Sequence, residues 1–210
     1  MEIRRLGVTD YQQTWQAMRD FTVNRDANTQ DELWITEHPS VYTLGLNGKR
    51  EHLLEETQIP IIQSDRGGQV TYHGLQQLVI YTLIDIKRQQ INSRQLVDIL
   101  EKAMIDTLVQ YGLHAQAKAD APGIYINQKK IGSIGLRIKQ GGSYHGLSLN
   151  NQLDLSPFNA INTCGYADLE VTNLVEQGII ISNQELAIPL VSSLYQQLNG
   201  GRSGFNRDSL

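Results

Sequence analysis

The stretch Leu78-Val79-Ile80-Tyr81-Thr82-Leu83-Ile84-Asp85-Ile86 is nearly all apolar and rich in β-branched residues. A run of this kind, without the alternation of a half-exposed strand, is typical of a β-strand buried on both faces. We therefore expect it at the centre of a sheet that is covered by other elements on each side.

The clearest helical pattern follows this strand. A helix is predicted between an N-cap at Asn92 or Ser93 and a terminator at Gly112. Its apolar stripe consists of Leu96, Ile99, Leu100, Ala103, Met104, Thr107, Leu108 and Tyr111. This stripe should pack on the sheet.

Two more helices are predicted near the ends of the chain. One follows the capping box Thr9-Asp10-Tyr11-Gln12, and the other follows the capping box Ser182-Asn183-Gln184-Glu185. Pro189 lies inside the second of these, so we expect it to delay the start of the helix or to kink it.

Shorter apolar runs predict the remaining strands, which are residues 33–36, 41–44, 123–126, 131–138 and 144–149. The second continues the first beyond Pro39, and the third and fourth flank the polar residues 127–130 as a hairpin. This order indicates an α/β (α+β) fold with a central mixed sheet flanked by helices. We expect one domain over residues 1–199, followed by a flexible polar tail over residues 200–210.

Composition limits the function classes. The 210 residues are 40% hydrophobic, which is enough to bury a core without a metal or a disulfide. The net charge of -4 argues against a nucleic-acid binder, which normally presents a basic face. We find no apolar signal segment and no run of eighteen apolar residues, and therefore expect a cytoplasmic protein.

The only cysteine, Cys164, lies in Ile161-Asn162-Thr163-Cys164-Gly165-Tyr166. Most free cysteines are small buried hydrophobic residues. Here small and polar neighbours leave the sulfur little apolar cover, and Gly165 permits a tight bend that could present the thiol to a substrate. Cys164 is therefore a candidate nucleophile.

Three glycine-rich stretches, residues 65–74, 130–135 and 143–148, need an explanation, because glycine within β-rich sequence often marks close approach of the backbone to a ligand. None is a nucleotide-binding fingerprint. Each one alone is more often a turn or a bulge than a binding site.

Together with the cysteine loop, these stretches resemble the octanoyltransferases of lipoate biosynthesis, also called lipoyl(octanoyl) transferases. The matching motifs run in the family's order from His38-Pro39-Ser40-Val41-Tyr42-Thr43-Leu44-Gly45 to Ile161-Asn162-Thr163-Cys164-Gly165-Tyr166-Ala167. The resemblance implies a fold similar to the catalytic domains of lipoate- and biotin-protein ligases.

The resemblance also implies the reaction and the partners. An octanoyl group would pass from octanoyl-acyl carrier protein to a lysine of lipoyl domains, in 2-oxoacid dehydrogenase complexes or in the glycine-cleavage H protein. Cys164 would carry the group as a thioester, and Lys130 would be its catalytic partner. No cofactor and no metal are implied, and we expect a monomer. Without the resemblance, Lys130 would be interpreted as a solvated lysine in a hairpin turn.

The implied substrate pocket includes three segments, namely Arg66, Gly67, Gly68, Gln69, Val70, Thr71, Tyr72 and His73, then Ser133, Ile134 and Gly135, and finally Gly146, Leu147 and Ser148. His73 would either donate a hydrogen bond to the substrate carbonyl or serve the loop structurally, and His145 has the same two possible roles.

Three other functions remain open. An ATP-dependent lipoate- or biotin-protein ligase of the same fold would need no nucleophilic cysteine. A non-catalytic acyl-binding module would form no cysteine adduct, and a Cys–His hydrolase would lose the acyl group to water. The chain also departs from the family pattern, because Leu75-Gln76-Gln77 replaces Pro-Gly-Gln, Gly142 stands where Cys is common, and Thr163 replaces the proline before Cys164.

Overall fold

In the computed structural model, which describes residues 1–55, 57–119, 121–165 and 169–199, the apolar run around Leu78 forms β6 (Gln77–Leu83). Every residue of β6 is buried. The strand lies between β2 and β10 in a seven-stranded sheet of the described chain, with the order β1-β2-β6-β10-β9-β8-β7. The prediction of an interior strand is confirmed, although the strand ends at Leu83 rather than at Ile86. The predicted tail, residues 200–210, lies outside the described residues.

The remaining strands of the large sheet are β1 (Glu2–Val8), β2 (Glu32–Glu37), β7 (Gln116–Ala117), β8 (Gly123–Ile126), β9 (Lys129–Lys139) and β10 (Gly142–Asn150). A second sheet contains β3 (Val41–Leu44), β4 (Ile61–Gln63) and β5 (Val70–His73). The helices are α1 (Tyr11–Val23), α2 (Ser93–Val109) and α3 (Asn183–Leu198), and the short 3₁₀ helices are η1 (Arg50–His52), η2 (Ser156–Ala160) and η3 (Thr163–Gly165).

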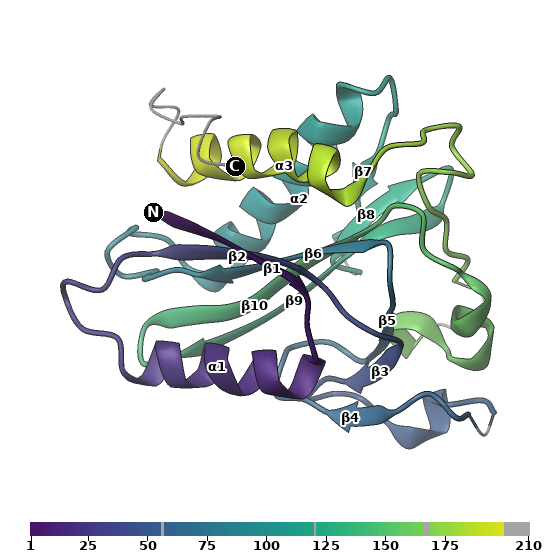
Figure 1. The fold of residues 1–210 in the computed structure, drawn as a ribbon, viewed down its shortest axis with the longest axis horizontal. Helices are drawn as coiled ribbons and strands as arrows, with labels where there is room; N and C mark the ends of the chain where they lie inside the picture. Colours follow the sequence, from purple (N-terminus) through teal and green to yellow (C-terminus); the bar gives the residue numbers. More distant parts are fainter. Residues whose placement is uncertain (56, 120, 166–168, 200–210) are drawn as a thin grey trace.

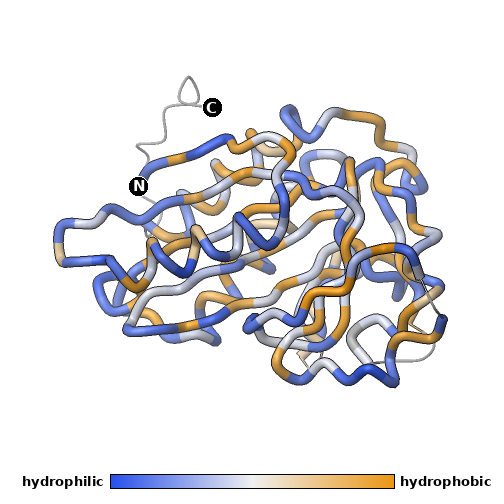
Figure 2. Tube along the Cα trace, turned by 60° about the horizontal axis from the view of Figure 1, so that its bottom comes forward, coloured by the Kyte–Doolittle hydropathy of each residue, from blue (hydrophilic) through white to orange (hydrophobic). Residues whose placement is uncertain are grey.

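The two faces of the large sheet are covered differently (Figure 1). Helices α2 and α3 pack on one face, where their apolar stripes join the inward side chains of β6 and β10 in the main core. Helix α1 and the small sheet lie on the other face. Figure 2 shows hydrophobic residues along the inner strands, whereas the turns at the left of that view are mostly hydrophilic. None of the described helices combines the length and the apolar character needed to cross a membrane.

The predicted starts of α2 and α3 are confirmed by their N-terminal caps. The side chain of Asn92 accepts a hydrogen bond from the backbone of Gln95, and Ser182 does the same for Glu185, each as half of a capping box. Pro189 lies within α3 but does not delay its start, which is at Asn183.

Two predictions near the N-terminus are wrong in detail. The N-cap of α1 is Asp10, whose carboxylate accepts from the backbone of Gln13 at 2.9 Å, while the hydroxyl of Thr9 lies 2.7 Å from that of Thr36. Residues 41–44 also do not continue the preceding strand within the same sheet. After Pro39 the chain crosses to the small sheet, where β3 pairs with β4 and β5.

The hairpin of β8 and β9 has a tighter turn than predicted. Asn127 and Gln128 both have positive φ, 48° and 70°, as the two central residues of a type I′ turn require. The turn therefore contains two residues rather than four, and Lys129 and Lys130 belong to β9. The interpretation of Lys130 as a solvated turn residue is wrong, because only 2% of it is exposed.

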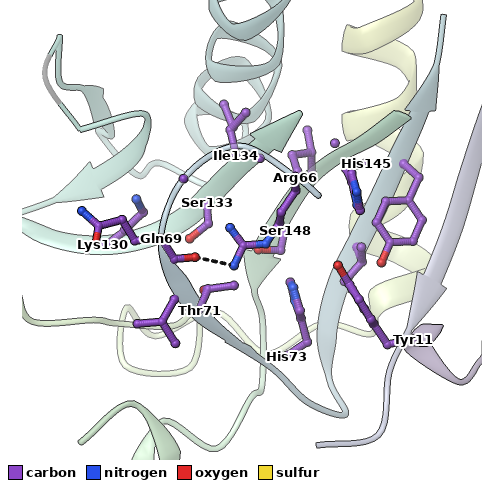
Figure 3. A pocket seen from close by; sticks show the side chains of 17 residues that line it. Tyr11, Arg66, Gln69, Thr71, His73, Lys130, Ser133, Ile134, His145 and Ser148 are labelled. Atoms are coloured by element: carbon purple, nitrogen blue, oxygen red, sulfur yellow. Dashed lines mark hydrogen bonds between the residues drawn. The ribbon is translucent and has the colours of Figure 1, made fainter. Parts of the chain in front are cut away.

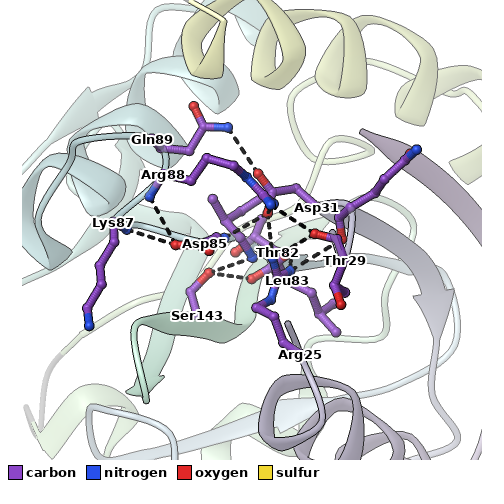
Figure 4. Close-up of polar contacts among 12 residues, drawn as sticks. Arg25, Thr29, Asp31, Thr82, Leu83, Asp85, Lys87, Arg88, Gln89 and Ser143 are labelled. Carbon is purple, nitrogen blue, oxygen red and sulfur yellow. Dashed lines mark hydrogen bonds and ion pairs between the residues drawn. The ribbon is translucent and has the colours of Figure 1, made fainter. Parts of the chain in front are cut away.

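A cluster of polar contacts surrounds Asp31, directly before the start of β2 (Figure 4). The carboxylate of Asp31 accepts hydrogen bonds from Arg25 at 2.9 Å, from Arg88 at 2.6 Å and from Gln89 at 3.0 Å. It also accepts from the backbone nitrogen of Asp85 at 2.7 Å. The connections that follow α1 and β6 are thus bound to the start of β2.

We expect Asp31→Asn to lower the free energy of unfolding by about 3 kcal/mol. The substitution leaves the buried, charged guanidinium of Arg25 without the carboxylate that compensates its charge. Urea denaturation would measure the change. Glu51→Gln is the matched control, since the pair of Glu51 with Lys49 is exposed and worth at most about 1 kcal/mol. Equal effects of the two substitutions would contradict the structural role given to Asp31.

Candidate active site

A hollow lies on the α1 side of the large sheet (Figure 3). Most of the predicted site residues line it, namely Arg66, Gly68, Gln69, Val70, Thr71, His73, Lys130, Ser133, Ile134, Gly135, His145, Gly146, Leu147 and Ser148. Segments far apart in the sequence therefore meet at one place.

Two of the predicted pocket residues lie elsewhere, and three lining residues were not predicted. Gly67 borders a neighbouring hollow, and Tyr72 packs in the core of the small sheet, with its hydroxyl 2.9 Å from that of Ser40. Tyr11, Val79 and Tyr81 line the hollow but belong to no glycine-rich stretch. No local sequence signal marked them, because the face of β6 that borders the hollow depends on the register of the sheet and Tyr11 lies in the first turn of α1.

Arg66 organises the loop that forms one wall of the hollow. The residue is 8% exposed, and its side chain donates to the carbonyl oxygens of Thr43 at 2.6 Å, Gly67 at 2.9 Å and Gln69 at 2.7 Å. The loop is thus wrapped around the guanidinium group, and Gly68 adopts the positive φ of 85° that this bend requires. The backbone nitrogen of Gly67 also donates to Leu136 of β9 at 2.8 Å, which joins the loop to the sheet.

Lys130 lies at the end of the hollow opposite Tyr11 (Figure 3). Its ammonium donates to the carbonyl oxygen of Pro122 at 2.8 Å and lies 5.4 Å from the ring centroid of Tyr125. Its backbone nitrogen donates to Glu170 at 2.8 Å, and its carbonyl oxygen accepts from Thr172 at 2.9 Å. The segment that comes shortly after Cys164 is therefore hydrogen-bonded directly to Lys130.

The backbone of Cys164 lies in η3, beside the same end of the hollow. Gly165 has a positive φ of 79°, and a side chain there would run into the side-chain amide of Gln69, which lines the hollow. The 3₁₀ turn is held by a hydrogen bond of 2.8 Å from Gly165 to Asn162, and Asn162 donates to His52 at 2.9 Å. The thiol of Cys164 lies outside the side chains that the structure describes.

His73 lies in the interior part of the hollow, and its hydrogen bonds define its tautomer. The amide nitrogen of Gln77 donates to Asn150 at 2.9 Å, so the amide oxygen of Gln77 accepts from Nδ1 of His73 at 2.6 Å. Burial and the neighbouring His38 lower the pKa of His73 to about 3. A neutral ring that already donates through Nδ1 has only an acceptor left at Nε2, so it cannot donate to a substrate carbonyl. This geometry supports the structural role for His73.

His145 lies beside Asp65, with its Nε2 3.0 Å from the carboxylate. Burial lowers the pKa of His145, although Asp65 opposes this. The neutral ring therefore donates its Nε2 proton to Asp65 at neutral pH. Although burial raises the pKa of Asp65, the hydrogen bonds from His145, Tyr144 and Trp15 hold it well below its usual value. This network fixes His145, which lines the hollow, in a backbone conformation with a φ of 61°. No cluster of metal ligands occurs among the residues that the structure describes.

The buried histidine makes the fold sensitive to mild acid. Between pH 6.5 and about 3 the unfolded chain binds a proton at His73 that the folded chain does not, so stability falls as the pH falls through this range. We expect His73 to lower the free energy of unfolding at pH 5 by about 2 kcal/mol relative to its value at pH 7, since one pKa unit corresponds to ~1.4 kcal/mol. In His73→Gln, the loss of unfolding free energy from pH 7 to pH 5 should be smaller by about this amount, as measured with urea.

His114→Gln is the control for this titration, because His114 is exposed. Its pH dependence should match that of the unaltered chain. A loss of stability that is the same in all three proteins would show that His73 is protonated in the folded state. Measurements above pH 5 avoid the range in which carboxylates such as Asp65 titrate.

Solved structures share this architecture. A crystal structure of lipoate-protein ligase A bound with ATP matches with a TM-score of 0.75 and 17% identity, over 95% of this chain and 86% of that chain. Biotin protein ligase from Aquifex aeolicus matches with a TM-score of 0.56 and 14% identity, over 95% of this chain and 70% of that chain. The fold is therefore that of the lipoate- and biotin-protein ligase catalytic domains, as the sequence resemblance implied.

Sequence comparison defines the family more narrowly. Residues 10–193 match the lipoyl protein ligase A/B catalytic domain. The octanoyltransferase of Psychromonas ingrahamii is 53% identical over 199 residues, which cover 95% of this chain and 92% of that protein. The octanoyltransferase of Laribacter hongkongensis is 52% identical over 198 residues, which cover 94% of this chain and 96% of that protein. The chain belongs to the octanoyltransferase family and is an acyltransferase.

Proposed function

We propose that this chain transfers an octanoyl group from octanoyl-acyl carrier protein to a lysine of a lipoyl domain, through a thioester on Cys164. One observation carries the proposal beyond the family assignment. The backbone loop of Cys164 packs against Gln69 on one side, and the segment that follows it is hydrogen-bonded to Lys130. Both Gln69 and Lys130 line the hollow, which supports the proposal that the single cysteine of the chain acts at the same site.

The first step of the proposed reaction exchanges one thioester for another. The thiolate of Cys164 attacks the carbonyl carbon of the carrier thioester, a new carbon–sulfur bond forms, and the carrier leaves as a thiol. The ammonium of Lys130 favours this step, because a nearby positive charge stabilises a thiolate. The exchange is close to balanced in free energy, and the thioester already supplies the activation that a ligase would take from ATP.

The second step forms the amide. The lysine amine of the lipoyl domain attacks the acyl-cysteine, a carbon–nitrogen bond forms, and the bond to Cys164 breaks. The attacking amine must lose a proton, and Lys130 accepts it in this proposal after it has given up its own proton to the departing carrier thiol. The burial of Lys130 restricts water at this end of the hollow, which protects the acyl-enzyme from hydrolysis.

The donor and the acceptors follow from this chemistry. We propose octanoyl-acyl carrier protein as the donor, and the lipoyl domains of 2-oxoacid dehydrogenase complexes and the glycine-cleavage H protein as acceptors. Relatives named octanoyltransferase and the match to the lipoyl protein ligase A/B catalytic domain support this choice.

The decisive experiment mixes the purified chain with octanoyl carrier protein and an unmodified lipoyl domain in the absence of ATP. Intact-protein mass spectrometry should show an octanoyl group on the lipoyl domain. A parallel reaction contains free octanoate and ATP in place of the carrier thioester, and there we expect no product. Product in the second reaction alone would contradict the proposal and identify an ATP-dependent ligase.

A further inference from the structure

The floor of the hollow consists of two rows of residues that run across three strands. In the first row, Ser148 of β10 pairs with Ser133 of β9 on one side and with Val79 of β6 on the other. The second row is formed in the same way by Gly135, Gly146 and Tyr81. In both rows the residues from β9 and β10 are small and the residue from β6 is large.

The small residues produce a trough whose depth is set by the backbone. A side chain at Gly146 would collide with the carbonyl oxygen of Ile80, so this position cannot be filled. At Gly135 a Cβ atom would lie 3.1 Å from Cδ of Arg66, because the arginine side chain passes over this glycine. The trough therefore crosses β9 and β10 beneath Arg66 and reaches β6.

The length of this trough matches a chain of eight carbons. Strands in a sheet lie about 4.8 Å apart, so the two spacings from β9 to β6 amount to roughly 10 Å. An extended octanoyl chain has seven carbon–carbon bonds, and each advances it by roughly 1.3 Å, for a total of about 9 Å. A chain that begins near Lys130 and Ser133 would therefore end at Val79 and Tyr81.

The far end of the trough is closed by groups that are held in place. The hydroxyl of Tyr81 donates to Nε2 of His38 at 2.6 Å, and Nδ1 of His38 donates to the carbonyl oxygen of Thr9 at 2.7 Å. Tyr11 donates its hydroxyl to Ser64 at 3.0 Å. Val79 is only 1% exposed and belongs to the cluster beneath α1. A longer chain would have to displace these buried residues, and tightly packed interiors resist such displacement.

We propose that Val79 and Tyr81 determine the maximal length of the acyl chain, with Ser148 keeping the middle of the trough open. This proposal rests on the proposed transfer function, whose acyl group it assigns to a defined path. According to this proposal, the length of the acyl chain is selected by the register of β6, β10 and β9 and not by any one loop.

Two substitutions test the proposal in opposite directions. Val79→Ala lengthens the trough, so the ratio of kcat/KM for decanoyl over octanoyl thioester should rise about tenfold, since each added methylene can then be buried. Ser148→Val narrows the trough halfway, at about 5 Å, so the ratio of kcat/KM for octanoyl over butanoyl thioester should fall about tenfold, because a four-carbon chain ends before the narrowing. When two thioesters compete in one reaction, the masses of the acylated lipoyl domain give the ratio of their kcat/KM values. The concentration of active enzyme does not need to be known.

Ile80→Val is the matched control, because Ile80 neighbours Val79 on β6 but faces the core under α2 and α3. Its chain-length preference should equal that of the unaltered protein. Unchanged ratios in both test variants, or an equal loss for all chain lengths, would overturn the proposal.

Calorimetric binding of the free butanoate, octanoate and decanoate separates this proposal from the transfer function. Altered length preferences in binding, in the absence of any transfer by the unaltered chain, would refute the transfer function and retain the length limit. If the unaltered chain transfers octanoyl groups but the substitutions at Val79 and Ser148 leave the length preference unchanged, the transfer function is retained and the length limit is refuted.

Discussion

Cys164→Ala is expected to lower kcat/KM for octanoyl transfer by at least about 10³-fold, because removal of a covalent nucleophile eliminates the two-step route. The chain should also lose its octanoyl adduct when it is mixed with octanoyl carrier protein and no acceptor. Since Cys164 is the only cysteine, an adduct on the unaltered chain that hydroxylamine cleaves at neutral pH, where it is selective for thioesters, must be located there. Intact-protein mass spectrometry before and after hydroxylamine treatment would measure it.

Cys164→Ser provides the comparison for this result. Serine is close to cysteine in size, but its hydroxyl lacks the acidity of a thiol, so an adduct should form far more slowly or not at all. A transfer rate near that of the unaltered chain in Cys164→Ala would exclude a covalent mechanism. It would also favour direct attack of the lysine amine on the carrier thioester.

Lys130→Met is expected to lower kcat/KM by about 10²-fold to 10⁴-fold, which is the usual contribution of a positioned general acid or base. Methionine retains most of the length and apolar volume of the lysine but carries no charge and no proton. The rates of adduct formation and of transfer to the acceptor should both fall, because Lys130 takes part in both proposed steps. Stopped reactions analysed by mass spectrometry would resolve the two rates.

Lys129→Met is the matched control for Lys130. The two lysines are adjacent on β9, but the side chain of Lys129 is 43% exposed and pairs with Glu170 at 3.2 Å. Its removal should leave kcat/KM within about twofold and change the stability by less than 1 kcal/mol. Similar losses in both variants would mean that Lys130 acts through the fold rather than through the chemistry.

The elements that could be predicted are those whose own sequence explains their burial. Strong apolar patterns mark β6, α2 and the β8–β9 hairpin, and α2 also has a recognisable N-terminal cap. All three elements are confirmed. β1 carried no such pattern, because most of its side chains are exposed and it is held mainly by its parallel pairing with β2. The small sheet was missed as a unit because pairing between distant short strands is not visible in any one of them.

The loops of the site were assigned through a family resemblance, and the structure brings most of those residues together around one hollow. Local sequence offered no reason to select Val79 or Tyr81, since both read as ordinary core residues of a buried strand. Their position opposite Ser148 and Gly146 depends on the register between β6 and β10. That register is a property of the folded sheet and could not be derived from the spacing of motifs along the chain.

The pairing of β8 with β9 has a consequence for the placement of Lys130. Lys130, Ser133 and Gly135 all line the hollow, although strict alternation along β9 would direct Lys130 to the face opposite Ser133. Ile124 pairs with Gly132 and Tyr125 pairs with Lys130, so Ile131 is the extra residue of a β-bulge. Deletion of this one residue would restore strict alternation and turn the ammonium of Lys130 toward the core under α2, even with the two-residue turn unchanged.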